Sequence, residues 1–238
     1  MKIFRFSPSR AALLGAFLLP ILASCGGGGS SGPKTPRVDS ATPAPVGFNA
    51  TDSCNYESFT PNYARSVSLL HWDRFPLRVS FTKNDQLSAS RQAVAVKGFN
   101  QWVAATGNRA DYTVVDSDAS PNVTVSFYKF TGGPGDTLGT TTVSYTGDNV
   151  IRKAEIKLGI TGNAADDQLT AAHEYGHTLG ISGHSPVELD LMYFTGNLSG
   201  EITPSDLNTV RTAYCDNFNR STARTSAAVG PLKTIVMH

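Results

Sequence analysis

The sequence predicts an α+β domain in which helices form a layer against one β-sheet. Several short segments alternate apolar and polar residues, which is typical of half-buried strands. Longer segments repeat apolar residues at helical spacing, which is typical of helices that pack one face on a sheet. We expect these elements in residues 61–215, a length that suits a single hydrophobic core.

Five segments have the composition of strands. In residues 77–81 apolar side chains alternate with polar ones. Two further strands are expected at 112–115 and 123–127. Residues 140–145 and 151–158 flank the turn sequence Gly-Asp-Asn and are therefore expected to form an antiparallel hairpin.

Three segments are predicted to be helices. The first begins with Ser88 or Ser90 as its N-cap and ends at Gly107. The second runs from about 167 to 179. The third begins with Thr203 as N-cap and Pro204 at its first position. The first and third helices carry apolar stripes, formed by Ala95, Phe99, Trp102 and Val103 and by Leu207, Val210 and Tyr214 respectively.

Three of the five histidines lie in the window from His173 to Met192. His173 and His177 are four residues apart, so a helix places both on one face, where they can bind one metal ion. Glu174 is placed to act on a water at that metal. Gly180 can end the helix and let the chain return His184 as a third nitrogen ligand. Three ligands leave a fourth position open, which is typical of a catalytic zinc site.

The window resembles the metzincin metallopeptidases, whose pattern is H-E-x-x-H-x-x-G-x-x-H followed by a Met-turn. Its residues, HEYGHTLG and then LMY, most resemble those of the matrixin branch. One residue departs from the pattern: Gly183 stands where the third histidine is expected, and His184 follows it. The resemblance implies a zinc endopeptidase with a twisted mixed sheet of about five strands, a long helix packed on it, a zinc helix, a Met-turn and a C-terminal helix.

The resemblance also assigns roles to single residues. Glu174 would be the general base of peptide-bond hydrolysis, and Met192 would form the hydrophobic floor under the zinc. Residues 138–145 would be the strand at the sheet edge on which a protein or peptide substrate pairs in extended form. Tyr193 and Phe194 are interpreted as the wall of a specificity pocket rather than as catalytic groups. Calcium is a further expected cofactor of the family, with candidate loop ligands at Asp116, Asp118 and Asp136.

Two other functions remain open from the sequence. A lipid-anchored binding or adhesion protein could keep a zinc site for stability without turnover, although Glu174 and an open fourth ligand position argue against it. A zinc hydrolase that acts on another amide, such as a cell-wall peptide, would need the same site. His71 and His238 are expected to be ordinary surface or packing residues.

Residues 1–24 have the features of a signal peptide of the lipoprotein type. Basic residues at 2, 5 and 10 precede an apolar segment that is too short to span a bilayer. The sequence Leu-Ala-Ser-Cys25 then resembles a bacterial lipobox, in which the cysteine carries lipid. Residues 25–60 follow as a Gly/Ser tether and Pro-rich linker. We therefore expect the protein to be lipid-anchored in the cell envelope, at the outer membrane or cell surface, or else secreted.

Two cysteines remain besides Cys25. Cys54 and Cys215 are candidates for a disulfide in an oxidising compartment. The alternative is a cysteine that masks the zinc, as in matrixin zymogens, but the sequence around Cys54 does not match that motif. Residues 216–238 are polar without a clear period and are interpreted as a tail.

Charge does not favour nucleic acid as a partner. The full chain has 20 Lys and Arg residues against 19 Asp and Glu residues, and removal of residues 1–24 takes three basic residues away. The remaining chain has a formal charge of −2, so an electrostatic attraction to nucleic acid is not expected. A monomer is expected.

Overall fold

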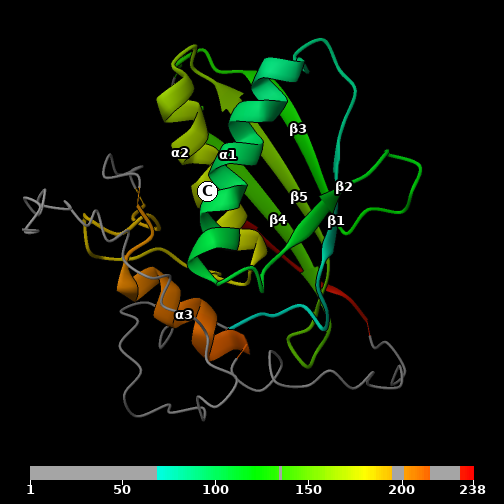
Figure 1. The fold of residues 1–238 in the computed structure, drawn as a ribbon, viewed down its shortest axis with the longest axis vertical. Coiled ribbons are helices and arrows are strands. Elements are labelled where there is room, and N and C mark those ends of the chain that lie inside the picture. The colour runs from blue at the N-terminus through cyan, green and yellow to red at the C-terminus, as the bar shows by residue number, and fades with distance from the viewer. Residues whose placement is uncertain (1–68, 134–135, 195–200, 215–230) are drawn as a thin grey trace, which may run out of the picture. The chain divides into compact units, whose positions relative to one another are not determined.

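The computed structural model describes residues 69–133, 136–194, 201–214 and 231–238, all of which belong to one compact unit. This part of the chain has an α+β fold with a six-stranded mixed sheet and three helices (Figure 1). In chain order the elements are β1 (Leu77–Phe81), α1 (Ala89–Ala105), β2 (Tyr112–Val114), β3 (Val123–Lys129), β4 (Gly139–Tyr145), β5 (Ile151–Ile160), α2 (Ala164–Thr178), α3 (Pro204–Tyr214) and β6 (Lys233–Met237).

The five strands predicted from the sequence are all present, and β4 and β5 form the expected antiparallel hairpin. The sheet order is β2-β1-β3-β5-β4-β6. Strands β2, β1, β3 and β5 are parallel to one another, while β4 runs antiparallel to both β5 and β6.

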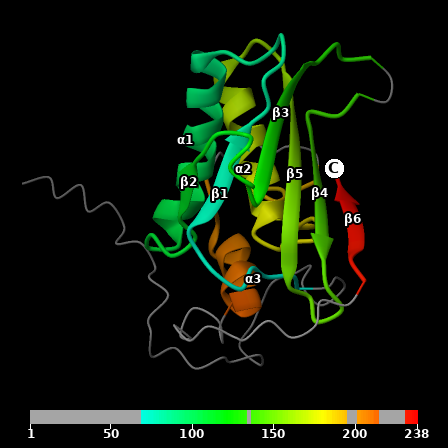
Figure 2. The ribbon, with the colours of Figure 1, turned by 90° about the vertical axis from the view of Figure 1, so that its right-hand side faces the viewer.

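The sixth strand corrects one expectation about the edge of the sheet. The sequence predicts about five strands with residues 138–145 at the edge, but β6 pairs along the outer side of β4 (Figure 2). Strand β6 falls within residues 216–238, so the interpretation of that whole segment as a tail is wrong for residues 233–237. Its five residues are too short to show a period, and their partner strand is nearly a hundred residues away in the chain.

Helices α1 and α2 cover the same face of the sheet (Figure 1). Helix α1 begins after the predicted N-cap Ser88, whose side chain accepts a hydrogen bond from the Arg91 amide. The two helices approach closely, because the Phe99 and Tyr175 rings stack with centroids 4.6 Å apart. The Trp102 indole also donates to the carbonyl of Ala172 at 2.8 Å. This packing fixes α2, the predicted zinc helix, against the core.

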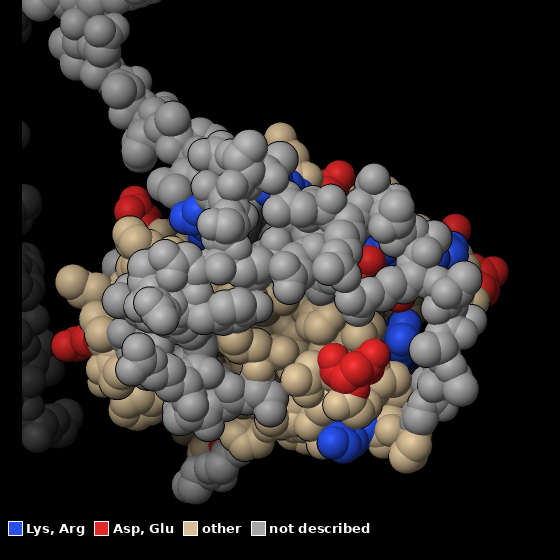
Figure 3. Space-filling view, turned by 90° about the horizontal axis from the view of Figure 1, so that it is seen from below, with Lys and Arg blue, Asp and Glu red and all other residues tan. Residues whose placement is uncertain are grey.

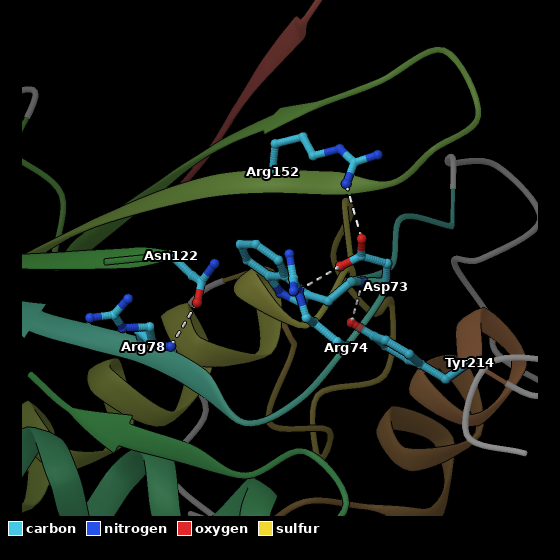
Figure 4. A network of polar contacts seen from close by, with 7 residues as sticks. Asp73, Arg74, Arg78, Asn122, Arg152 and Tyr214 are labelled. Carbon is cyan, nitrogen blue, oxygen red and sulfur yellow. Dashed lines mark hydrogen bonds and ion pairs between the residues drawn. The ribbon is translucent and has the colours of Figure 1, made fainter. Parts of the chain in front are cut away.

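The segment that leads into β1 connects three other elements of the domain. The Trp72 amide donates to the Tyr214 hydroxyl on α3 at 3.1 Å, and the Trp72 indole donates to the carbonyl of Thr178 at the end of α2 at 2.7 Å. Asp73 forms an ion pair with Arg152 of β5 at 3.0 Å (Figure 4). Figure 4 also shows Tyr214 pointing from α3 toward this segment.

Charged side chains of both signs are interspersed on the described surface in Figure 3. Among the helices that the structure describes, none is long and apolar enough to cross a membrane. The predicted signal peptide, Cys25, the linker and the proposed Cys54–Cys215 pair lie outside the described residues, and so do residues 216–230.

Gly180 provides a test of how tightly the end of α2 is packed. It has a φ of 108°, and a Cβ atom there would overlap the carbonyl oxygen of Leu70. We expect Gly180→Ala to lower the free energy of unfolding by about 3 kcal/mol, because backbone strain and a backbone clash add. Urea denaturation measures this change.

Substitutions at Gly162 and Gly147 separate the effect of backbone strain from that of the clash. Gly162 has a φ of 89° with no atom within 4 Å of its added Cβ, so Gly162→Ala should cost about 1 kcal/mol from conformation alone. Gly147 has open space and no positive φ, so Gly147→Ala should change stability by less than about 0.5 kcal/mol. Equal losses in all three variants would contradict the packing argument.

Candidate metal centre

Helix α2 carries the first two predicted ligands, His173 and His177, on one face. It begins three residues earlier than predicted, at Ala164, because the side chain of Asn163 caps it by accepting from the Ala165 amide at 3.0 Å. Asp166 and Asp167 lie in the first turn, where a carboxylate interacts favourably with the helix dipole.

The turn after α2 brings the third histidine back toward the helix. Gly180 takes up a positive φ there, and its amide donates to the carbonyl of His177 at 3.0 Å. Residue Ile181 then forms an isolated bridge with Leu69, which holds the returning chain against the segment before β1. Gly183, the residue that stands where the metzincin pattern would have its third histidine, lies in this returning segment between Ile181 and His184.

His173, His177 and His184 form one compact cluster. Their ring centroids are 4.9, 5.2 and 5.0 Å apart, and one ligand atom from each lies within 4.8 Å of the other two. In the described part of the chain, this is the one group of three or more His, Cys, Asp or Glu residues with such geometry, and it contains neither His71 nor His238. The structure therefore brings together the three histidines that the sequence singled out.

Main-chain carbonyls orient two of the imidazole rings. Nδ1 of His173 donates to the carbonyl of Leu191 at 2.8 Å, and Nδ1 of His177 donates to the carbonyl of Ile181 at 2.6 Å. Because a carbonyl only accepts, both rings carry their proton on Nδ1, which leaves Nε2 with a free lone pair. Such a bond on the far nitrogen is the usual support of a metal-binding histidine.

The remaining nitrogens fit a metal ion. Nε2 of His177 and Nε2 of His184 are buried without a hydrogen-bond partner, which is costly unless another group binds them. Burial also lowers the pKa of all three histidines, to about 4 for His173, so that the rings are neutral as ligands must be. Imidazole suits zinc as well as copper, iron and nickel, so the cluster is compatible with zinc without identifying the metal.

Met192, whose role as a floor under the metal stays a prediction, packs against α2, the helix that carries His173 and His177. It is fully buried, and its sulfur packs so closely on Gly176 of α2 that no side chain would fit at that glycine. The carbonyl of Met192 accepts from the amide of Ser185 at 2.7 Å. Because Ser185 follows His184 directly, this bond fixes the third histidine to the turn that contains Met192.

Asp206 of α3 is a supporting residue that the sequence analysis missed. Its buried carboxylate accepts from the amides of Leu191 at 2.9 Å and Met192 at 3.2 Å, and from the amide of Thr203 at 3.0 Å. The Thr203 hydroxyl in turn bonds Asp206 and Asp190. The sequence does show Asp206 in a Thr-x-x-Asp cap at the start of α3. It does not show that Asp206 also contacts the turn around Met192, because only the tertiary fold brings the two together.

Glu174 is buried between α2 and β4. The Thr141 hydroxyl donates to its Oε2 at 2.6 Å and also approaches its main-chain carbonyl at 3.1 Å. Gly139, also on β4, lies so close that an added Cβ would overlap the Glu174 carboxylate. Burial raises the pKa of Glu174 to about 8, and the Thr141 hydrogen bond opposes that rise. A carboxyl group with this pKa exchanges a proton readily near neutral pH.

Other predicted site residues are not part of this cluster. The rings of Tyr193 and Phe194 lie 4.6 Å apart, and Phe194 is largely exposed, so a role as a pocket wall stays a prediction. Asp136 accepts hydrogen bonds from Thr131 and Gly133 in its own loop. It does not join Asp116 and Asp118 in a metal-binding group among the described residues, so the calcium site also stays a prediction.

Comparison with models of known families gives no match, and no curated protein matches the chain.

Substitution of the histidines tests the metal centre. We expect the protein to bind one divalent ion per chain, and His173→Ala, His177→Ala and His184→Ala each to lower the affinity for zinc by at least about a hundredfold, since each removes one of three ligands. Competition with a chromogenic chelator measures the affinity, and circular dichroism checks the fold.

His71→Ala is the matched control, because His71 is described but lies outside the cluster. It should keep the wild-type affinity. If His184→Ala also kept it, the third ligand would have been assigned wrongly.

Proposed function

We propose that this protein is a zinc-dependent endopeptidase of the metzincin type, with a matrixin-like site. The observation that carries the proposal is the combination of three neutral, converging histidines with a buried carboxyl group, Glu174, on the same helix as two of them. When bound, zinc would supply a Lewis acid that acidifies water and polarises a carbonyl group. His173, His177 and His184 would hold it.

Glu174 would be the general base and then the general acid. Its pKa of about 8 applies to the protein alone, and a cation held by the adjacent histidines would favour the ionised form. The carboxylate could then accept a proton from the attacking water and deliver it to the leaving amine. The Thr141 hydroxyl, by donating to Oε2, would keep the carboxylate in one orientation during both transfers.

The burial of Glu174 supports an enzyme over a binding protein that keeps zinc for stability. Burial of a carboxyl group without an ion-pair partner is unfavourable, and a structural site would gain nothing from it. The three histidines also leave a ligand position for water, whereas structural zinc sites usually have four protein ligands. Strand β4 supports a peptide substrate, since an extended chain paired with its outer side, where β6 lies in this structure, would pass beside Glu174.

Replacement of the proposed base tests the function. We expect Glu174→Gln to bind zinc as tightly as the wild type but to cleave an unfolded protein substrate roughly a hundredfold to ten-thousandfold more slowly, the usual contribution of a general acid–base group. Zinc content and release of peptide fragments are measured on the same samples.

Glu155→Gln is the control, because Glu155 lies exposed on β5 in an ion pair with Lys153. It should leave cleavage unchanged. Full activity of Glu174→Gln would show that another group is the base. Cleavage of a cell-wall peptide but of no unfolded protein would favour a different amide substrate.

A further inference from the structure

Strand β6 occupies the side of β4 that a substrate would need. Its residues pair in register along β4, from Lys233 opposite Tyr145 to Met237 opposite Thr141. Figure 2 shows β6 as the outermost strand, with β4 between it and β5. Because each side of a strand offers one row of backbone donors and acceptors, no second peptide can pair there while β6 is in place.

The direction of β6 is that of a peptide that approaches the candidate active site. It runs antiparallel to β4, so its chain advances from the Tyr145 end toward Thr141. Thr141 is the residue whose hydroxyl bonds Glu174. Residues 233–237 therefore take the place of substrate residues on the amino-terminal side of the bond to be cleaved. His238 follows Met237 directly. Burial is the main cause of the lowered pKa of His184, and the charge of His238 lowers it further, so His238 lies within electrostatic range of His184.

The side chains of β6 differ on its two faces. Met237 is buried and joins the core cluster, and Ile235 is partly buried and packs against it, whereas Val236 between them is 52% exposed. The inward residues are apolar, and they lie opposite Thr141 and Val143 of β4. An extended peptide that replaced β6 would place its own alternate side chains at these two positions.

We propose that β6 is an intramolecular pseudosubstrate, which keeps the peptidase latent until it leaves β4 and which marks the preferred substrates as extended peptides with apolar residues at the Ile235 and Met237 positions. This proposal rests on the proposed function. A tethered strand competes with substrate at an effective concentration on the order of millimolar, so a dilute substrate would displace it poorly. A strand of five residues with a single fully buried side chain can still open without unfolding of the domain.

A reversible crosslink tests latency directly. Thr142 and Val236 are Cα partners, and neither side chain is among the buried residues, so Thr142→Cys with Val236→Cys should form a disulfide that locks β6 on β4. We expect the oxidised protein to cleave an unfolded protein at least tenfold more slowly than the same protein after reduction. For the two single-cysteine variants and the wild type, the ratio of reduced to oxidised activity should be near one.

A variant in which β6 is released from β4 tests whether loss of β6 raises the activity. Ile235→Asp combined with Met237→Asp places charges on the inward face of β6 and should raise kcat/KM at least tenfold. Val236→Asp introduces the same residue on the outward face and should leave kcat/KM unchanged. Because loss of Met237 could also weaken the core, the melting temperature of each variant is compared with that of the wild type.

Peptide binding supplies a readout that does not depend on catalysis. A labelled synthetic peptide with the sequence of residues 231–238 is added to zinc-loaded Glu174→Gln protein, in released and in locked form. We expect fluorescence anisotropy to show binding to the released form and at least tenfold weaker binding to the locked form.

The outcomes separate the two proposals. Selective peptide binding without cleavage by any variant would show that β6 covers a peptide-binding side of β4, but it would overturn the peptidase function and, with it, the latency. Cleavage at one rate by locked, released and wild-type protein would keep the peptidase and overturn the pseudosubstrate, with β6 then a permanent edge of the sheet. Equal peptide binding to the released and locked forms would also overturn it.

Discussion

Two hydrogen bonds from imidazole to main-chain carbonyl define the geometry of the candidate metal centre. They connect His173 to Leu191 and His177 to Ile181, so each ring of α2 is oriented by a different loop. The ring positions therefore depend on where those loops lie. The loop with Ile181 is held by Gly180 and the segment before β1, and the loop with Leu191 by Asp206 of α3. The sheet and α1 influence the two rings indirectly, because their packing fixes the position of α2.

The same helix has to satisfy two opposing demands. A metal ion would need the histidines of this helix to be neutral, and burial favours this form by lowering their pKa. Under the proposed function Glu174, between them in sequence, would have to exchange a proton, and burial moves its pKa in the opposite direction, to about 8. One dry environment thus prepares both kinds of group. Strand β4 completes this environment through Thr141 and Gly139, one as a hydrogen-bond donor and the other by leaving room for the carboxylate.

Local patterns in the sequence were enough to predict part of this arrangement. Alternation predicted the strand at 77–81, and strand composition with the Gly-Asp-Asn turn predicted four more. Helical spacing alone predicted that His173 and His177 share one face of a helix. Gly180 indicated the turn that returns His184. The predicted start of α2 is too late, because the pattern did not mark Asn163 as its cap. Strand β6 and the role of Asp206 could not be predicted, since both depend on partners distant in sequence, and a five-residue segment or a lone aspartate does not reveal its partner.

The contact between Trp72 and Tyr214 spans 142 positions of the chain, and the Asp206 carboxylate that accepts from the amide of Met192 lies in the same helix, α3. During synthesis from the amino terminus, both histidines of α2 leave the ribosome before α3 exists to orient the carbonyl of Leu191. The centre is consequently among the last parts of the domain to be completed. A nascent chain shortened before α3 would carry all three histidines and still lack the geometry to hold a metal ion tightly.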